Sequence, residues 1–359
     1  MREALIDQGP DGFMGGCPPG GANSPATRKS LGESVERHRH SRSGVSTKRK
    51  ARDVNEILAH GLHSMDVSEP VSHGLLHIFP LRGGTLEEGN LSLLEDGLRA
   101  GTLRVEEQHE GSCAPGLRIV NEGDSRVLIL EGDELIGAGR HRVANSSVLI
   151  NAGSEVTLPV SCVELGRWSY RSRAFSPATG RPHLTLRRLT TRSVHYSLKS
   201  GRDHRSDQRT EWRELDHVAR RYRTALPARA LRASRYYNSE RLDAFEKLAR
   251  ELPEGTSGVV VAIGERFVLL EVLAGPCTFV RVFRQLLSGC AFESVGLDRP
   301  YGTPEVQAVR SFIDAAADCA HREQQAVGAG RDVKLEGEGI SGYALIGQRG
   351  VLHAAAFAE

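Results

Sequence analysis

The chain has 359 residues, of which 39% are hydrophobic and 26% are charged, and this is enough apolar material for a globular core. Its formal net charge is only +2, from 47 Lys and Arg against 45 Asp and Glu, which excludes a protein whose whole surface is built to hold a polyanion. Six scattered cysteines form no CxxC pair, and no apolar run is long enough to cross a bilayer. We therefore expect a cytoplasmic protein without disulfides or a membrane span.

The first 64 residues differ in composition from the rest. Segments such as GGCPPGGANSPATRKS and RHRHSRSGVSTKRKAR are rich in Gly, Pro, Ser, Arg and His, and such sequences bury too little apolar surface to offset the entropy lost on ordering. We expect residues 1–64 to be a disordered basic extension. Its basic cluster, from Arg28 to Arg52, could contact nucleic acid or another polyanion. Alternatively, translation starts at Met65 and the upstream stretch is not part of the native protein.

From Gly74 onwards, short apolar runs alternate with Gly, Asp and Asn, which is typical of strands and turns. The turn residues Gly132-Asp133 separate two of these runs. The pattern predicts strands near residues 75–80, 102–107, 117–121, 126–131, 134–137, 145–150 and 155–163.

Helical spacing is found in fewer segments. In LSLLEDGLRAG, Leu91, Leu94 and Leu98 predict one amphipathic helix that ends at Gly101. The Arg-rich and weakly periodic residues 169–210 are expected to form a long loop over the sheet. Further helices are predicted near residues 209–224 and 240–251.

The last third of the chain alternates strands with one long helix. SGVVVAIGERFVLLEVLAG predicts a hairpin that turns at Gly264-Glu265-Arg266, and PCTFVRVFRQLLSG predicts a helix from Pro276 to Gly289. The fold class is therefore α+β: a strand-rich, sandwich- or barrel-like antiparallel sheet with several packed helices. We expect a single domain over residues 65–359, in which residues 296–359 form a C-terminal helix plus a strand hairpin.

Familiar site motifs are weak or missing. Gly337, Gly339 and Gly342 match GxGxxG, but strands are expected after them where a dinucleotide site needs a helix. The sequence contains no P-loop, no GxSxG elbow and no HExxH helix. We predict no metal site and identify no cofactor. Cys277 lies at the start of a predicted helix, as a reactive thiol could, although a half-buried structural thiol is favoured; Cys162 is expected in the core.

Polar residues are densest between positions 131 and 168. A fully apolar strand precedes Glu131 and Asp133, and a second segment then carries Arg142, Asn145 and Ser146. Carboxylates next to cationic groups indicate either a salt-linked hairpin or a functional site.

The end of the next predicted strand extends this group. Glu164 has the same strand parity as Cys162, and a buried carboxylate requires a partner, for which Arg167 and Arg142 are the natural choices. Trp168 follows directly and would suit a planar or anionic ligand. The alternative is an ion pair that closes a sheet edge, with Trp168 in the core.

The run LRIVNEGDSRVLILEGDELIGAGRHRVANSSVLINAGSEVTLPVSCVELGRWSYRSRAF, followed by Asp207, Gln208 and Trp212, resembles the ARPP-1 domain family. The name abbreviates "ADP-ribosylglycohydrolase and rhodanese-phosphatase superfamily associated protein", and the resemblance covers about residues 70–295. The turn in the family is closer to Gly-Ala-Lys-Gln-Asn-Arg, whereas this chain has Gly139 in place of the Lys. A role that requires a lysine at position 139 is therefore not expected.

The resemblance implies an association with ADP-ribose-processing enzymes. It does not imply a particular reaction. Our leading hypothesis is a domain that binds or processes an ADP-ribose-like or NAD-derived nucleotide. Ligand contacts are expected from Arg142, Asn145, Ser146, Arg167, Trp168, Asp207 and Gln208, and catalytic or ribose-binding roles from Glu164, Glu131 and Asp133. The rival hypothesis is a non-catalytic interaction module that acts with a partner enzyme of ADP-ribose metabolism. Neither involves a membrane, and nucleic acid is expected only at the basic N-terminal extension.

Overall fold

The structure is a computed structural model, and it describes residues 53–87, 89–107, 116–137, 140–162, 175–177, 181–221, 247–294 and 302–359. Residues 51–359 form one compact unit, and the description below concerns this unit alone.

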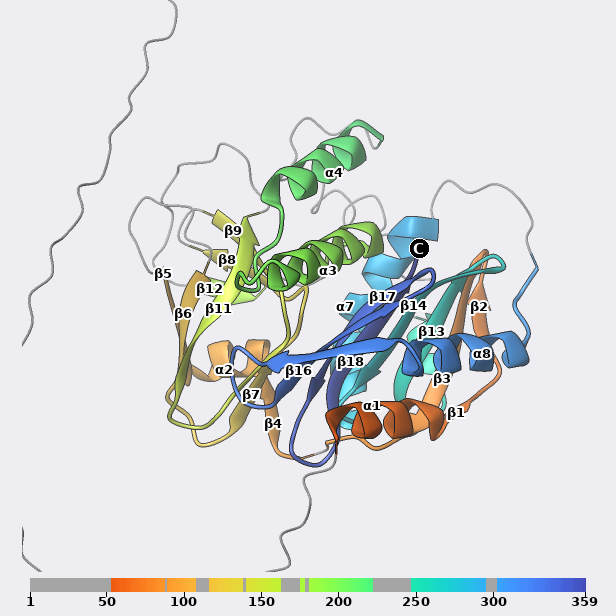
Figure 1. Cartoon of the computed structure of the whole chain (residues 1–359), viewed down its shortest axis with the longest axis horizontal. Helices are drawn as coiled ribbons and strands as arrows, with labels where there is room; N and C mark the ends of the chain where they lie inside the picture. Colours follow the sequence, from red (N-terminus) through yellow and green to blue (C-terminus); the bar gives the residue numbers. More distant parts are fainter. Residues whose placement is uncertain are drawn as a thin grey trace, which may run out of the picture. The chain divides into compact units, whose positions relative to one another are not determined.

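The largest element is a nine-stranded antiparallel sheet, shown in Figure 1. Strands from both ends of the described chain meet in it, because β13 pairs with β3 on one side and β14 pairs with β18 on the other. The order across the sheet is β1-β3-β13-β14-β18-β17-β16-β15, with β2 paired to β3. The strands are β1 (Met65–Val67), β2 (Val71–His73), β3 (Leu76–Gly83), β13 (Thr256–Ile263), β14 (Arg266–Leu273), β15 (Ala320–Gln325), β16 (Arg331–Gly337), β17 (Ile340–Ile346) and β18 (Val351–Ala358).

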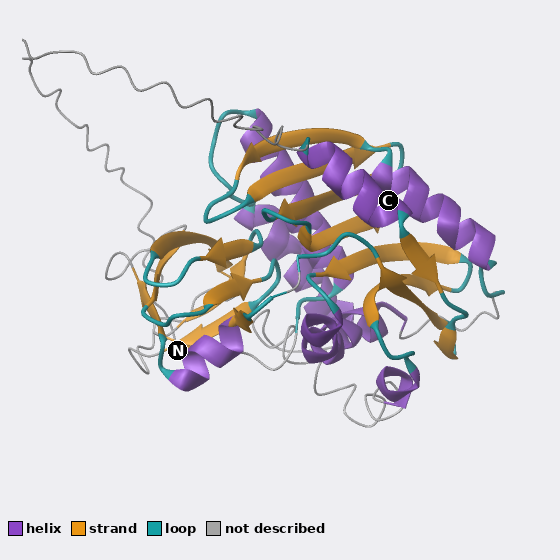
Figure 2. Cartoon of the chain, turned by 90° about the horizontal axis from the view of Figure 1, so that it is seen from below, coloured by secondary structure: helices purple, strands orange, loops and turns teal. Residues whose placement is uncertain are grey.

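Both faces of this sheet are apolar. Helices cover both of them (Figure 2). Alternate residues of β13 point to opposite faces: Val259 and Val261 pack with α7 (Pro276–Ser294), whereas Val260 packs with α1 (Val54–His63) and α8 (Val306–Ala317). This is why the central strands read as nearly continuous apolar runs in the sequence.

Two smaller sheets lie beside the large one. The first has the order β10-β7-β4 and the second β12-β8-β9-β11-β6-β5, and their inner residues share one apolar core with α2 (Leu94–Ala100). The strands are β4 (Leu91–Leu93), β5 (Leu103–Glu107), β6 (Gly116–Asn121), β7 (Arg126–Ile129), β8 (Glu134–Gly137), β9 (Arg140–Ala144), β10 (Val148–Ile150), β11 (Glu155–Cys162) and β12 (Phe175–Pro177).

Helices α3 (Leu184–Lys199) and α4 (Gln208–Arg221) connect the two regions. Leu184 belongs to the core of the large sheet, whereas Leu186 packs with Val143 of β9 and Leu215 of α4. Helix α3 therefore contacts both the large sheet and the smaller ones.

The predicted fold class is confirmed: the protein is α+β, strand-rich and largely antiparallel, with helices packed on its sheets. The hairpin that turns at Gly264-Glu265 and the C-cap at Gly101, with φ of 70°, are also as predicted. Among the helices of the described part of the chain, none is long and apolar enough to span a membrane.

The prediction of one long loop over residues 169–210 was wrong, because α3 occupies Leu184–Lys199. Its buried face carries Arg187, Thr191 and His195 at helical spacing. They share this face with the buried Leu184, Leu186, Val194 and Leu198 and so interrupt the apolar periodicity that normally indicates a helix.

Two further boundaries differ from the prediction. Leu91–Leu93 is a strand that pairs with β7, and only Leu94–Ala100 is helical. Helix α7 passes through Gly289 and continues to Ser294. Gly289 does not end this helix: a Cβ there would lie 2.7 Å from the carbonyl oxygen of Pro182, so the glycine permits close packing.

Only the last three residues of the predicted strand at 145–150 form a strand. β9 ends at Ala144 and β10 begins at Val148. The intervening polar residues leave the ladder, and Asn145 donates from its backbone to Pro159.

Residues 53–63 also differ from the expected disordered extension. Helix α1 begins after the N-cap Asp53 and buries Leu58 and Leu62 in the core shared with α8. The rest of the basic extension, residues 1–52, lies outside the described residues.

Candidate functional site

Glu131, which the sequence places in the polar centre, is fully buried and accepts hydrogen bonds from Arg187 and Tyr343. Nε of Arg187 lies 2.9 Å from Oε2 of Glu131, and Nη1 of Arg187 lies 2.8 Å from Oε2 of Glu271 on β14. Nε2 of His353 lies 3.0 Å from Oε1 of Glu271. We call these five residues the Arg187 network.

The protonation states in the Arg187 network follow from burial and charge. Burial alone would raise the pKa of Glu271, but Arg187 and His353 outweigh it and hold that pKa far below its usual value. Burial lowers the pKa of His353 despite the attraction of Glu271, so this imidazole is neutral. Because an ionised carboxylate only accepts hydrogen bonds, Nε2 of His353 carries the proton, and its Nδ1 accepts from the Ser147 hydroxyl at 2.6 Å.

Asp133 is held in the turn between β7 and β8. Its Oδ2 accepts from the backbone N–H of Leu130 at 2.8 Å, and its Oδ1 accepts from Arg181 at 2.8 Å. Gly132 between them has φ of 83°, where only glycine is unstrained. The turn thus places Asp133 beside the Arg187 network. Arg181 also contacts this network, because its Nη1 lies 3.4 Å from Oε1 of Glu271.

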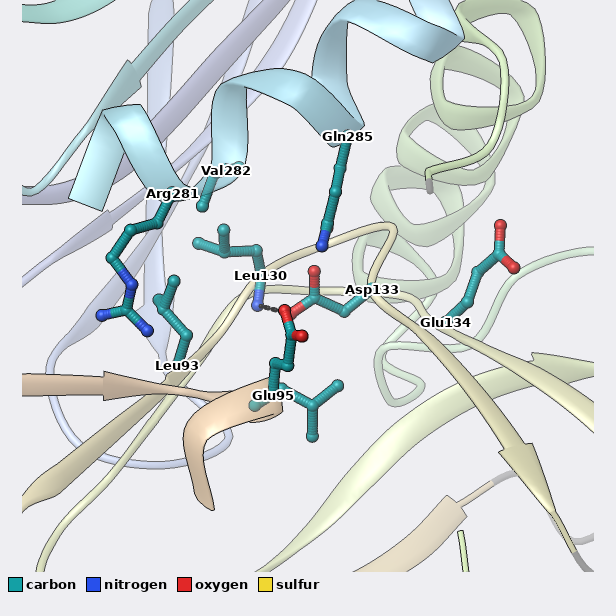
Figure 3. Close-up of a pocket in the computed structure, with 9 residues that line it drawn as sticks. Leu93, Glu95, Leu130, Asp133, Glu134, Arg281, Val282 and Gln285 are labelled. Atoms are coloured by element: carbon teal, nitrogen blue, oxygen red, sulfur yellow. Dashed lines mark hydrogen bonds between the residues drawn. The ribbon is translucent and has the colours of Figure 1, made fainter. Parts of the chain in front are cut away.

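The hollow in front of this turn is small. Figure 3 shows Asp133 and Gln285 pointing towards one another, while Glu134 points away from the other labelled side chains. The hollow encloses about 40 Å³ between α2, the β7–β8 turn and α7, which is room for no more than a few water molecules.

The hydrogen-bond partners of Arg142, Asn145 and Ser146 differ from those of the Glu131 carboxylate. Arg142 is buried and forms an ion pair with Glu107 of β5, in which its Nη2 lies 3.0 and 3.1 Å from the two carboxylate oxygens. Asn145 donates to the carbonyl oxygen of His204 at 3.2 Å, and Ser146 Oγ lies 2.9 Å from Nδ1 of the same histidine. The structure therefore does not bring Arg142 and Glu131 into one open cleft.

Asp207 and Gln208 organise the start of α4. Asp207 is exposed and accepts hydrogen bonds from Arg209 and Thr210, chiefly from the Thr210 hydroxyl, and these lower its pKa. Gln208 donates to the carbonyl oxygen of Cys162 at 3.0 Å, and the indole N–H of Trp212 donates to the same oxygen at 2.8 Å. Both side chains thus fasten α4 to the end of β11.

Three residues from the same prediction, Glu164, Arg167 and Trp168, lie outside the described residues. Cys162 is a core residue, 2% exposed, as predicted. Cys277 is an exposed free thiol near the start of α7, rather than the half-buried one that the sequence favoured. Within the described ranges, no His, Cys, Asp and Glu side chains converge as a metal-ligand set.

A larger opening lies elsewhere, at the first turn of α3. It encloses about 590 Å³. We call it the α3 cleft, and its lining comes from α3, the β13–β14 hairpin, α7 and the end of β18: Leu184, Thr185, Arg188, Ile263, Glu265, Arg266, Val268, Glu293, Phe357 and Ala358.

The α3 cleft combines an apolar floor with opposite charges. The ring of Phe357 lies between the cleft and the Arg187 network, with the Arg187 guanidinium 5.3 Å from its centre. Glu293 accepts from the backbone N–H of Thr185 at 2.8 Å. Burial opposes its ionisation, but His183 and Thr185 prevail and lower its pKa to about 2.

The sequence did not indicate this cleft, because its lining comes from four segments far apart in the chain. A partial signal exists in α3, where Leu184 and Arg188 are four residues apart and therefore neighbours on a helix surface. Only tertiary packing brings the β13–β14 turn beside them.

The protein is thus an α+β domain with a sealed ionic network and an open, mixed-charge cleft. It belongs to a known family: the ARG and Rhodanese-Phosphatase-superfamily-associated Protein domain, ARPP-1, matches residues 64–357. No curated protein and no solved structure matches the chain.

Proposed function

We propose that the protein binds an ADP-ribose-like or NAD-derived nucleotide in the α3 cleft. The observation that carries the proposal is that Arg188 and Arg266 flank an apolar floor in a cleft of about 590 Å³. Ligand pockets for small molecules and cofactors typically enclose about 300–1,000 Å³ and are mostly apolar, with a few polar groups that fix orientation.

The two arginines suit the phosphates of such a ligand. Arg188 comes from α3 and Arg266 from the β13–β14 turn, and guanidinium groups bind phosphate oxygens with paired N–H donors. Arg188 is oriented by donating to the carbonyl oxygen of Ala358 at 3.1 Å. Since Arg266 is exposed, it is free to turn towards a bound anion.

The remaining lining suits the rest of a nucleotide. Ile263 and Val268, which are partly exposed, provide the apolar surface on which a base can rest. Glu265 and Glu293 supply carboxylates that accept hydrogen bonds from ribose hydroxyls. The depressed pKa of Glu293, about 2, keeps it ionised and acceptor-only at neutral pH.

The residues that the sequence assigned to the ligand divide into two groups under this proposal. Glu131 and Asp133 form ion pairs with Arg187 and Arg181 at α3 and just before it, whereas Arg142 pairs with Glu107 between β9 and β5. Glu164 and the Arg167-Trp168 pair lie outside the described residues, and their nucleotide contacts remain part of the hypothesis.

The family description agrees with this class of ligand. It records an association with ARG, the ADP-ribosylglycohydrolase, and with the rhodanese-phosphatase superfamily. An associated protein that holds ADP-ribose or a related nucleotide would share a ligand with such an enzyme.

Isothermal titration of the purified chain with ADP-ribose tests the proposal. We expect saturable binding, weakened about tenfold or more by Arg188→Glu or Arg266→Glu, because a hydrogen bond to a charged group contributes about 1.5–3 kcal/mol. Arg322→Glu is the matched control, since Arg322 is an exposed arginine on the edge strand β15. No heat at millimolar ADP-ribose, or equal affinity in all three variants, would overturn the proposal and leave the non-catalytic interaction module as the better account.

A further inference from the structure

The solvent-exposed face of α3 carries cationic and aromatic side chains next to the α3 cleft. Arg188 lines the cleft, and Arg192, Tyr196 and Lys199 follow it at intervals of four, four and three residues. Residues three and four apart are neighbours on one face of a helix. These four side chains, which we call the α3 stripe, therefore run in one line from the cleft along the helix.

We infer that the α3 stripe binds a single-stranded oligonucleotide whose terminal nucleotide occupies the α3 cleft. This inference rests on the proposed function and extends it from a mononucleotide-sized ligand to a chain. It also places a nucleic-acid contact on the folded unit, whereas the sequence indicated one only in the N-terminal extension.

Tyr196 is the first observation in favour. It is 70% exposed, one of two large hydrophobic side chains in the described residues with such exposure. The opposite face of α3 is fixed by buried polar contacts, among them Arg187 with Glu131. An aromatic ring held in water on a rigid helix is a platform on which bases of any sequence stack.

The cations on either side of Tyr196 are the second observation. Nε of Arg192 lies 3.6 Å from Glu359, and Nζ of Lys199 lies 2.5 Å from Glu336. Both pairs are exposed, so each contributes little to stability, typically about 0–1 kcal/mol. Phosphates can therefore compete with these carboxylates for the two cations.

The length of the stripe is the third observation. Arg188 and Lys199 are separated by eleven helical residues, which corresponds to about 16 Å along the axis. A single nucleotide in the cleft does not reach Lys199. A chain that alternates phosphates and bases meets cation, aromatic ring and cation in turn.

The test is a length series at constant salt: AMP and the di-, tetra- and hexa-adenylates, each titrated into the full chain. We expect affinity to rise with length, and Arg192→Ala, Tyr196→Ala and Lys199→Ala combined to remove the rise while leaving AMP affinity unchanged. Tyr196→Ala alone should weaken tetra-adenylate about fivefold or more, the effect of one stacked base, and Tyr196→Phe should restore it. Lys247→Ala with Arg322→Ala is the control, because both residues are exposed and lie outside α3.

The outcomes separate this inference from the proposed function. Failure of both AMP and ADP-ribose to bind would overturn the cleft proposal and this inference together. Binding of AMP without a gain on lengthening, or a gain that survives the triple substitution, would overturn only the α3 stripe. Tighter binding of an oligomeric ADP-ribose than of an oligoadenylate of equal charge would contradict the assignment to nucleic acid.

Discussion

Arg187 lies between Glu131 and Glu271 and donates to both carboxylates, at 2.9 and 2.8 Å. Glu131 follows β7 of a smaller sheet, whereas Glu271 belongs to β14 of the large sheet. One side chain of α3 therefore joins the two sheet regions and fixes the helix that forms one wall of the α3 cleft.

Substitution of Arg187 by Leu should be strongly destabilising. It would leave the buried Glu131 without its cation and Glu271 with only the more distant Arg181, and removing one partner of a buried ion pair costs about 3–5 kcal/mol. Urea denaturation measures the change in the free energy of unfolding. The control is Arg192→Leu on the exposed face of the same helix, where we expect about 0.5 kcal/mol or less; equal effects of the two substitutions would contradict the account.

Helix α1 should contribute to the stability of the unit. Leu58 is fully buried in the core that α1 shares with α8, and Leu58→Ala is expected to cost about 2–5 kcal/mol. His60→Ala, at an exposed position on the same helix, is the matched control. If Leu58→Ala leaves the unfolding midpoint in urea unchanged, α1 does not pack as described.

Stability should fall on acidification below pH 6.5. Burial and the nearby charge of Lys334 lower the pKa of His195 to about 4. The unfolded chain takes up this proton as pH falls through about 6.5, whereas the folded chain resists until about 4. The stabilisation is therefore complete above pH 6.5 and is lost between pH 6.5 and 4.

The size of this effect can be measured by urea denaturation across that range. For a shift of this kind the loss is on the order of 2–3 kcal/mol. His195→Gln removes the titrating group and should flatten the dependence of unfolding free energy on pH. An unchanged slope in His195→Gln would show that other groups cause the acid sensitivity.

Thiol reactivity should differ sharply between Cys277 and Cys290 of α7. Cys277 is exposed, whereas Cys290 is buried, and burial raises the pKa of the Cys290 thiol far above its usual value. Since the thiolate is the reactive form, iodoacetamide should label Cys277 in the native protein and Cys290 only after denaturation. Peptide mass spectrometry reads out both sites, and early labelling of Cys290 would contradict the packing of α7.

Local pattern predicted much of the fold, because strand runs and turns depend on nearby residues. The hairpin of β13 and β14 is an example: two apolar runs around Gly264 are sufficient to define it. Helix α3 could not be found in this way, since polar residues interrupt the apolar spacing of its buried face. Arg187, Thr191 and His195 are spaced as on one face of a helix, but a search for apolar residues at that spacing does not detect them because they are polar.

The sequence predicts some residues of the polar centre, such as Glu131, but not the residues with which they pair. Glu131 was singled out because it follows an apolar strand and its charge would then need compensation. Its partner Arg187 lies 56 residues further along the chain, in the region expected to be a loop, and Glu271 lies on a strand of the other sheet. Ion pairs between residues of different sheets depend on how the sheets pack against each other. The alternation of residues along a single strand does not specify that packing.

The most direct test is a crystal structure of the protein with ADP-ribose bound. The account predicts ligand density in the α3 cleft, with phosphates between Arg188 and Arg266 and the adenosine over Ile263 and Val268. Ligand density at another place in the protein, with the α3 cleft unoccupied at saturating ADP-ribose, would contradict it.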